Sequence, residues 1–275
     1  MRKVFTLICL LVTVLAIFSQ GKVLDKAYLK CQYEYTLEND TLSGKTRDDL
    51  LILQIGEYLS KCYSHYSNQV DSIFSLPNRD EILKYEINKA MSRGDTNYPH
   101  KRMKAYVYKN YPQGKMTITD GLSLQDYVYE DELNAQQWEI HDSTTTVLDY
   151  QCQMATCDFR GRQWTAWFTT DIPVSDGPWK FSGLPGLIME AYDKGNQYVF
   201  TIVGLQKVED EPIFFSETYV GSKRFDKSNR IDFLKAKKRY LMNMGGYIEM
   251  ETGIDLSGGN PPKIMRYDLL ELDYK

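Results

Sequence analysis

Apolar and polar residues alternate along much of the chain with the two-residue period of a half-buried β-strand. Leu29, Cys31, Tyr33 and Tyr35 fall on one face of the first such segment, with polar or charged residues between them. Residues 50–55 (LLILQI) predict a buried strand. Further strands are predicted at residues 58–66, 105–108, 116–119, 125–130, 137–141, 145–154, 163–169, 187–192, 198–208 and 267–272. Short turns at Gly114, Asp120-Gly121, Gly161 and residues 194–196 indicate antiparallel pairing.

Two segments replace this alternation with helical spacing. Residues 80–91 carry Asp80 and Glu81 where the first turn of a helix would be, and Gly94 follows as a stop signal. Residues 226–244 predict a second helix. With strands dominant and two helices, we expect an α+β fold with a large, mainly antiparallel sheet and one or two packed helices. No linker divides residues 22–275, which predicts a single domain.

The first 21 residues have the features of a secretory signal peptide. Arg2 and Lys3 precede an uncharged stretch at residues 4–18, and Ser19 and Gly21 provide small residues for a cleavage site. As a helix that stretch would span roughly 23 Å, which is shorter than the ~30 Å core of a membrane. We therefore expect an exported protein that begins near Lys22 and has no membrane span after cleavage.

Four cysteines remain after that cleavage: Cys31, Cys62, Cys152 and Cys157. In an oxidising compartment they predict at least one disulfide, and loop closure favours the pairs 31–62 and 152–157 over the other two pairings. A straight strand over residues 152–157 would separate its two cysteines by about 16 Å. A disulfide tolerates only about 7 Å between Cα atoms, so that pair requires a bend. Cys62 and His65 are spaced like zinc ligands, but no further ligands complete the set.

Composition and the absence of known motifs exclude several functional classes. With 43% hydrophobic and 13% aromatic residues the chain has enough material for a packed core, and a net charge of −4 disfavours nucleic-acid binding. Neither an H-E-x-x-H helix, a G-x-S-x-G elbow nor a glycine-rich phosphate loop occurs. We therefore predict no catalytic residues, metal or cofactor. An exported hydrolase remains an alternative, which clustering of His141, Arg162 and Asp171 in one cleft would favour.

The most informative stretch is residues 159–188, FRGRQWTAWFTTDIPVSDGPWKFSGLPGLI. Its prolines and glycines between residues 177 and 186 predict a stiff loop with an unusual backbone path. In one interpretation the arginines bridge turn carbonyls and carboxylates, and the tryptophans fill space between loop and sheet. In the other, these side chains form a surface for an apolar or anionic ligand. The candidate ligand-binding residues are Arg160, Arg162, Trp164, Trp167 and Trp179. We expect Trp167 to lie in the core and Trp179 to be partly exposed.

The same stretch resembles a known family. Residues 183–188 (GLPGLI) are similar to the signature of the GLPGLI family of exported bacterial proteins. The similarity extends to Tyr150, Cys152, Ala155 and residues 159–162, 166–168, 171–173, 177–181 and 251–254. The resemblance implies a signal-bearing protein with no established reaction and no catalytic residues to transfer.

The sequence therefore predicts a non-enzymatic protein in the periplasm or cell envelope of a Gram-negative bacterium. We expect its sheet to bind an unknown ligand or an envelope protein partner. A purely structural partner of an outer-membrane complex is a further hypothesis.

Overall fold

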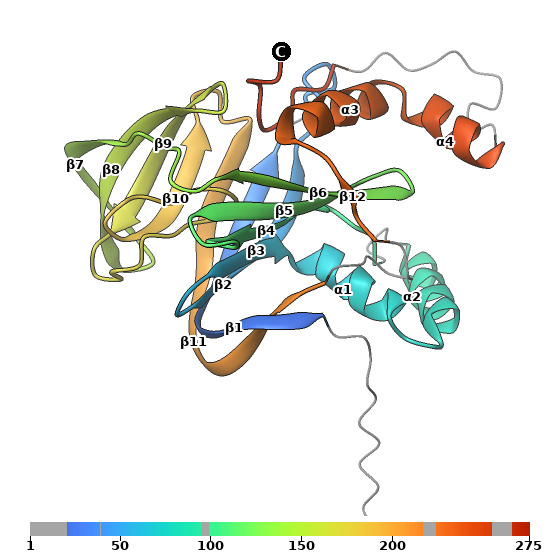
Figure 1. Cartoon of the computed structure of the whole chain (residues 1–275), viewed down its shortest axis with the longest axis horizontal. Helices are drawn as coiled ribbons and strands as arrows, with labels where there is room; N and C mark the ends of the chain where they lie inside the picture. Colours follow the sequence, from blue (N-terminus) through green and yellow to red (C-terminus); the bar gives the residue numbers. More distant parts are fainter. Residues whose placement is uncertain (1–20, 39, 95–98, 217–223, 255–265) are drawn as a thin grey trace, which may run out of the picture.

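A computed structural model describes residues 21–38, 40–94, 99–216, 224–254 and 266–275. The predicted signal peptide, apart from Gly21, lies outside the described residues. Twelve strands form one sheet in the order β12-β6-β5-β4-β3-β2-β1-β11-β10-β9-β8-β7 (Figure 1). The strands are β1 (Lys22–Leu37), β2 (Arg47–Gly56), β3 (Ser60–Ser64), β4 (Tyr106–Lys109), β5 (Lys115–Leu122), β6 (Gln125–Glu132), β7 (Glu139–Val147), β8 (Tyr150–Phe159), β9 (Arg162–Thr169), β10 (Leu187–Asp193), β11 (Tyr198–Phe215) and β12 (Asp226–Lys227).

Neighbouring strands pair antiparallel throughout the sheet except for β12, which runs parallel to β6. The predicted antiparallel sheet is therefore confirmed, but the predicted α+β class is wrong. The described chain is mainly β, with four short helices: α1 (His65–Phe74), α2 (Arg79–Arg93), α3 (Arg230–Met242) and α4 (Met244–Thr252).

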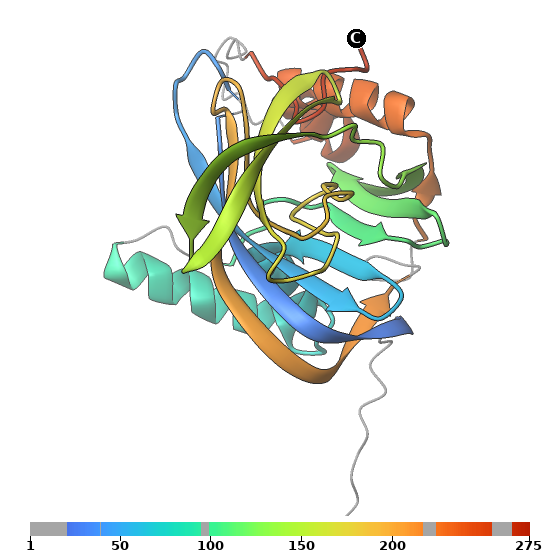
Figure 2. The same cartoon turned by 90° about the vertical axis from the view of Figure 1, so that its left-hand side faces the viewer.

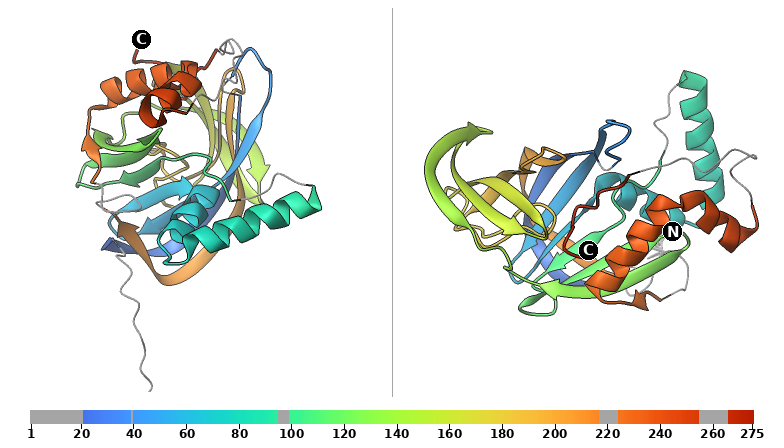
Figure 3. Two further views of the ribbon diagram at one scale, coloured as in Figure 1. Left: turned by 90° about the vertical axis from the view of Figure 1, so that its right-hand side faces the viewer. Right: turned by 90° about the horizontal axis from the view of Figure 1, so that it is seen from above.

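The physical reason for this correction is the curvature of the sheet. Figure 2 shows the sheet curling around the loop that joins β9 to β10, so that its concave face is filled by its own chain rather than by a helical layer. The helices lie at the margins instead. In Figure 3, α2 projects away from the sheet, and α3 with α4 lies across one end.

The concave face carries the core. Leu29, Cys31, Tyr33 and Tyr35 of β1 are all buried, and the polar residues between them are not, which confirms the alternation in the sequence. β1 and β11 are 16 and 18 residues long and pair along most of their length, so they form the longest curved ribbon in the sheet. Most strands place a row of apolar side chains on the same inner surface.

The ends of several helices and strands differ from prediction, because local capping contacts determine where an element begins or ends. The helix predicted at residues 80–91 is confirmed as α2, and Gly94 ends it in the left-handed conformation (φ 68°). The strand predicted at residues 58–66 stops at Ser64, because the Ser64 hydroxyl accepts the Ser67 amide (3.1 Å) and so begins α1. The helix predicted at residues 226–244 begins only at Arg230 and ends at Met242.

Further elements differ from prediction. The single strand predicted at residues 145–154 is divided between β7 and β8 by a turn at residues 148–149. Asp120-Gly121, predicted as a turn, lies inside β5. α4 was not predicted. The strand predicted at residues 267–272 is reduced to one isolated bridge between Asp40 and Tyr267.

The loop between β9 and β10, residues 170–186, is part of the core. Its side chains Trp179, Phe181 and Leu184 are buried. The Phe181 ring lies 4.7 Å from the Trp164 ring of β9 and 5.8 Å from the Phe200 ring of β11, measured between centroids and with edge-to-face geometry. Such aromatic pairs stabilise a core beyond their buried area. We call residues 170–186 the core loop.

The four cysteines are free thiols, which contradicts the predicted disulfide. Cys31 and Cys62 both lie opposite Leu53, one on each side of β2, so two strand spacings separate them. That distance is roughly 9–10 Å, beyond the ~7 Å limit for a disulfide. Cys152 and Cys157 lie five residues apart within β8, whose pairing with β9 is regular between them. The register shift of β8 against β7 at this point places the extra residues, 141–143, on β7.

No helix in the described ranges is long and apolar enough to cross a membrane.

Two glycines of the core loop provide a stability test. A Cβ atom on Gly186 would lie 2.0 Å from the backbone oxygen of Thr169, whereas one on Gly183 would meet nothing nearer than 3.7 Å. Gly183 has a φ of +92°, so a side chain there costs only its backbone strain, about 1–2 kcal/mol. We expect Gly186→Ala to lose several kcal/mol and Gly183→Ala to lose about 1–2 kcal/mol in urea unfolding. Equal stabilities of Gly186→Ala and the wild-type protein would contradict this packing.

Candidate functional site

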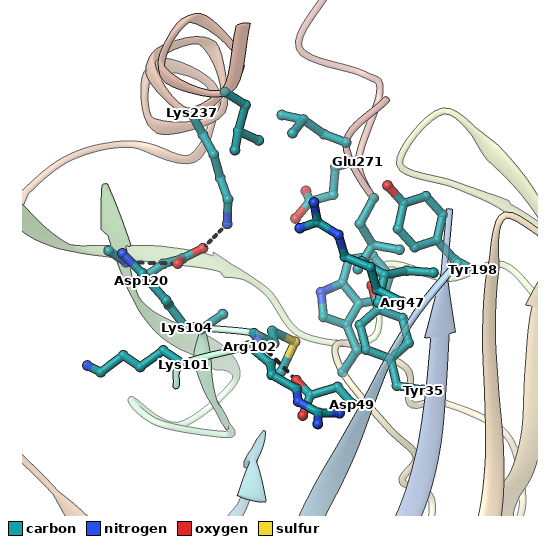
Figure 4. Close-up of a pocket in the computed structure, with 18 of the residues that line it drawn as sticks. Tyr35, Arg47, Asp49, Lys101, Arg102, Lys104, Asp120, Tyr198, Lys237 and Glu271 are labelled. Atoms are coloured by element: carbon teal, nitrogen blue, oxygen red, sulfur yellow. Dashed lines mark hydrogen bonds and ion pairs between the residues drawn. The ribbon is translucent and has the colours of Figure 1, made fainter. Parts of the chain in front are cut away.

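A cleft of about 710 Å³ opens at one end of the concave face. It lies between the paired ends of β1 and β2, the segment at residues 100–105, β5, α3 and the C-terminal residues 268–271. Trp179 and Lys180 of the core loop also line it. Figure 4 shows these elements around the cleft, with Tyr35 and Tyr198 on one side and Asp120 and Lys237 on the other.

Much of the cleft surface is apolar. β1 contributes Tyr35, whose ring stacks on Phe200 with a centroid distance of 4.5 Å. Other parts of the chain contribute further apolar side chains, among them Met103, Val107, Ile118, Leu122, Leu234, Leu241, Met244 and Leu269. Concave, mostly apolar surfaces with a few polar groups are typical of small-molecule sites.

Asp49 is one of three buried carboxylates in the cleft wall, with Asp120 and Glu271. Its Oδ1 accepts the Ser64 hydroxyl (2.8 Å) and the Leu50 amide (2.8 Å), and its Oδ2 accepts the Met103 amide (2.9 Å). Burial raises the pKa of Asp49 above its ordinary value, and these hydrogen bonds oppose the shift without reversing it. The bond to Met103 attaches residues 100–105 to β2 and so gives the cleft this wall.

Cations surround the mouth, and most of them are paired. Lys237 of α3 binds Asp120 (2.5 Å). Arg102 pairs with Asp48 and lies over the ring of Tyr66 at 3.7 Å. Arg47 and Lys104 differ from these, because neither side chain has a hydrogen bond or ion pair to any part of the chain that the structure describes.

Arg47 is exposed at the start of β2, and in Figure 4 its side chain projects into the cleft. A group of negative charge entering the cleft would find this guanidinium available.

A buried charge network closes the cleft from behind. Lys180 Nζ lies 2.8 Å from Asp131 of β6 and 2.5 Å from Glu271 near the C-terminus. Two arginines, Arg160 before β9 and Arg230 at the start of α3, pair with the same carboxylates and with Asp273. The network thus joins the core loop to β6, α3 and the C-terminal segment.

The five candidate ligand residues do not form one surface. Arg162 is buried, bonds to Asp193 and Gln197 at 2.8 Å each, and donates to the carbonyls of residues 269 and 270. Arg160 belongs to the charge network. Trp164 is buried in the core, and Trp167 is half-buried on the opposite face of β9. Of the five, Trp179 alone lines the cleft.

The solvent exposure of the Trp167 and Trp179 side chains differs from what we expected from the sequence. Trp179 is 4% exposed although we expected it to be partly exposed, and Trp167 is half-buried although we expected a core position. The cause at residue 179 is a left-handed backbone conformation (φ 51°), which is uncommon for a non-glycine residue. The cause at residue 167 is strand parity, because Trp164 occupies the inner face three positions earlier.

The residues that would have favoured a hydrolase are not brought together. Arg162 begins β9 and Asp171 lies two residues beyond its end at Thr169, so the two are separated by the whole strand, roughly 23 Å long. His141 lies on the edge strand β7, where its Nε2 is 2.7 Å from the Thr156 hydroxyl. None of the three lines the cleft. Within the described residues no group of three or more His, Cys, Asp or Glu side chains has the geometry to hold a metal ion.

Most residues of the cleft were not predicted from the sequence. A signal was present in the two short charged runs at residues 47–49 (RDD) and 100–104 (HKRMK). Neither run has the spacing of a known motif, and they are more than fifty residues apart. Only the antiparallel order of β1 to β5 brings them together.

One segment of the chain matches a known protein family. Residues 159–190 match a family model described as "Protein of unknown function (Porph_ging)". No curated protein matches the chain.

Two crystal forms of PNGF-II, in space groups P21 and C2, are similar to 75% of this chain, with TM-scores of 0.49 and 0.48 and identities of 12% and 13%. This chain covers 32% of the PNGF-II chain, about a third of its length.

The tryptophan positions give a direct test of the core. We expect Trp179→Ala to lower the free energy of unfolding by about 3–5 kcal/mol, because it empties a buried aromatic site. Trp167→Ala should lose about 1–2 kcal/mol, since much of that side chain already contacts water. Chemical denaturation of both variants checks the order, and a larger loss at Trp167 would contradict it.

Proposed function

We propose that this chain is an exported, GLPGLI-type protein of the bacterial envelope that binds an amphipathic small molecule in the cleft and does not catalyse a reaction on it. The apolar part of the ligand would lie against Tyr35, Leu241 and Met244, and its anionic group would pair with Arg47. The observation that carries the proposal is the combination of an apolar cleft with one unpaired guanidinium at its mouth.

The size and chemistry of the cleft support this reading. Its volume of about 710 Å³ lies within the ~300–1,000 Å³ range of small-molecule sites. The neighbouring cations Arg102 and Lys237 are occupied by Asp48 and Asp120, whereas Arg47 and Lys104 have no ion pair within the described part of the chain. Of these two, Arg47 has the planar guanidinium that can bind an anionic group with two parallel hydrogen bonds. A charge-assisted bond at a partly desolvated mouth would fix the orientation of the ligand.

The hydrolase alternative has less support. A buried carboxylate with a raised pKa in a cleft is a typical candidate for acid–base chemistry, and Asp49 has both properties. However, three hydrogen bonds from the protein already occupy its two oxygens. That arrangement favours a structural role for Asp49 in holding residues 100–105.

The proposal is tested first by native mass spectrometry of protein purified from the periplasm, which should retain a small molecule released on denaturation. A second test uses anilinonaphthalene sulfonate, an amphipathic anion, with dodecanoate as competitor. We expect Arg47→Glu to weaken probe binding by about tenfold or more, equivalent to about 1.4 kcal/mol.

Lys45→Glu is the matched control, because Lys45 is exposed two residues earlier and does not line the cleft. It should change probe binding by less than about twofold. Equal losses in the two variants, or saturable binding that dodecanoate does not displace, would contradict the proposed site.

A further inference from the structure

A second pocket of about 330 Å³ lies at the other end of the concave face. It is bounded by Tyr28 of β1, the turn at residues 56–60, Lys109 of β4, residues 133–134 and parts of the core loop. Tyr28 and Tyr35 are seven residues apart on β1, so roughly 23 Å separates the two sites along the strand. The core loop lines both.

A β-bulge directs Tyr28 to this pocket. The register of β1 shifts between Ala27 and Leu29 against both neighbouring strands. Against β2 this leaves Tyr28 as the extra residue, and against β11 the extra residues are 208–210 of β11. Bulges of this kind re-aim a side chain and are frequent beside functional sites. Tyr28 is 48% exposed, and burial followed by the nearby Asp176 carboxylate raises the pKa of its phenol.

Two buried hydroxyls in the pocket lack hydrogen-bond partners. Ser60 and Ser182 are 3% and 2% exposed, and neither Oγ has a partner in the described part of the chain. Both residues line the pocket. A buried hydroxyl without a hydrogen-bond partner destabilises the protein, so a native site of this kind is expected to hold a polar molecule.

A buried ion pair completes the polar wall. Lys109 Nζ lies 2.5 Å from Asp176 Oδ1 and donates to the carbonyls of Gly177 (2.6 Å) and Phe181 (2.7 Å), so its three protons are used. Asp176 Oδ1 also accepts the Gly177 amide (2.7 Å). Its Oδ2 has no hydrogen-bond partner among the residues described and remains an acceptor for a ligand.

The pocket therefore offers hydroxyl donors and a carboxylate acceptor, with Tyr28 and the 69%-exposed Tyr58 at its rim. We propose that this pocket binds a neutral, polyhydroxylated ring such as a saccharide unit. Hydroxyl groups of the ring would accept hydrogen bonds from the Ser60 and Ser182 hydroxyls and donate one to the Asp176 carboxylate. The apolar face of the ring would pack on the side chain of Tyr28 or Tyr58. The carboxylates of Asp176 and Glu57 disfavour an anion here, which distinguishes this pocket from the cleft.

Saturation-transfer NMR on the mature protein tests the site, with glucose, galactose, mannose and N-acetylglucosamine as probes. We expect at least one of these sugars to bind. Ser60→Ala and Tyr58→Ala should each weaken that binding at least about fivefold. Arg47→Glu, in the separate cleft, should leave it unchanged, so the outcome does not depend on the function proposed for the cleft.

The melting temperature distinguishes a ligand site from a structural one. Because the Ser60 hydroxyl has no partner, Ser60→Ala should melt at the wild-type temperature or above. Ser72→Ala, which removes an exposed hydroxyl in α1, is the control for the substitution itself. No sugar signal in the wild-type protein, or a lower melting temperature for Ser60→Ala with unchanged sugar binding, would overturn the proposal and leave the hydroxyls as ligands of ordered water only.

Discussion

The Lys109 ammonium group is the interaction on which this fold depends most. It is held inside the curved sheet by one carboxylate and two backbone carbonyls of the core loop. Burying a lysine costs several kcal/mol of lost hydration free energy. Here the three short contacts of the ammonium group offset that cost. Because all three acceptors belong to residues 176–181, the lysine fixes the path of the loop rather than a single side chain.

The path of the core loop determines which part of the concave face is packed with side chains and where the two pockets lie. Trp179 and Phe181 occupy the middle of the concave face, and the two pockets lie on either side of them. Lys180 provides a second anchor, through Asp131 and Glu271, and thereby holds the C-terminal segment that forms one wall of the cleft. A sheet that encloses its own loop needs no covering layer of helices, which is why the chain is mainly β.

The segment that matches the family model, residues 159–190, coincides with β9, the core loop and the first part of β10. Its arginines bind carboxylates and carbonyls of distant segments, and its buried aromatic rings pack against one another. These contacts support the structural interpretation of Arg160, Arg162 and Trp164. The pocket residues, by contrast, come mostly from other parts of the chain.

Sequence reasoning reached the strands because side-chain alternation is a local property. It placed Leu29 to Tyr35 on one face and found α2, where both the periodicity and the stop signal are local. It failed at Trp179, because a positive φ at a tryptophan follows from tertiary packing and has no sequence signal. It missed Arg47 and Asp49 for a related reason: a cleft formed by segments far apart in sequence exists only once the strand order is known.

Amide hydrogen exchange of the core loop tests the central claim most directly. In the wild-type protein, the amides of Trp179 and Phe181 should exchange as slowly as those of β1, because they donate to Cys62 and Pro178 inside the core. In Lys109→Met, the same amides should exchange faster by a larger factor than those of β1. Exchange of the loop amides within seconds in the wild-type protein, or equal protection in the variant, would contradict the account.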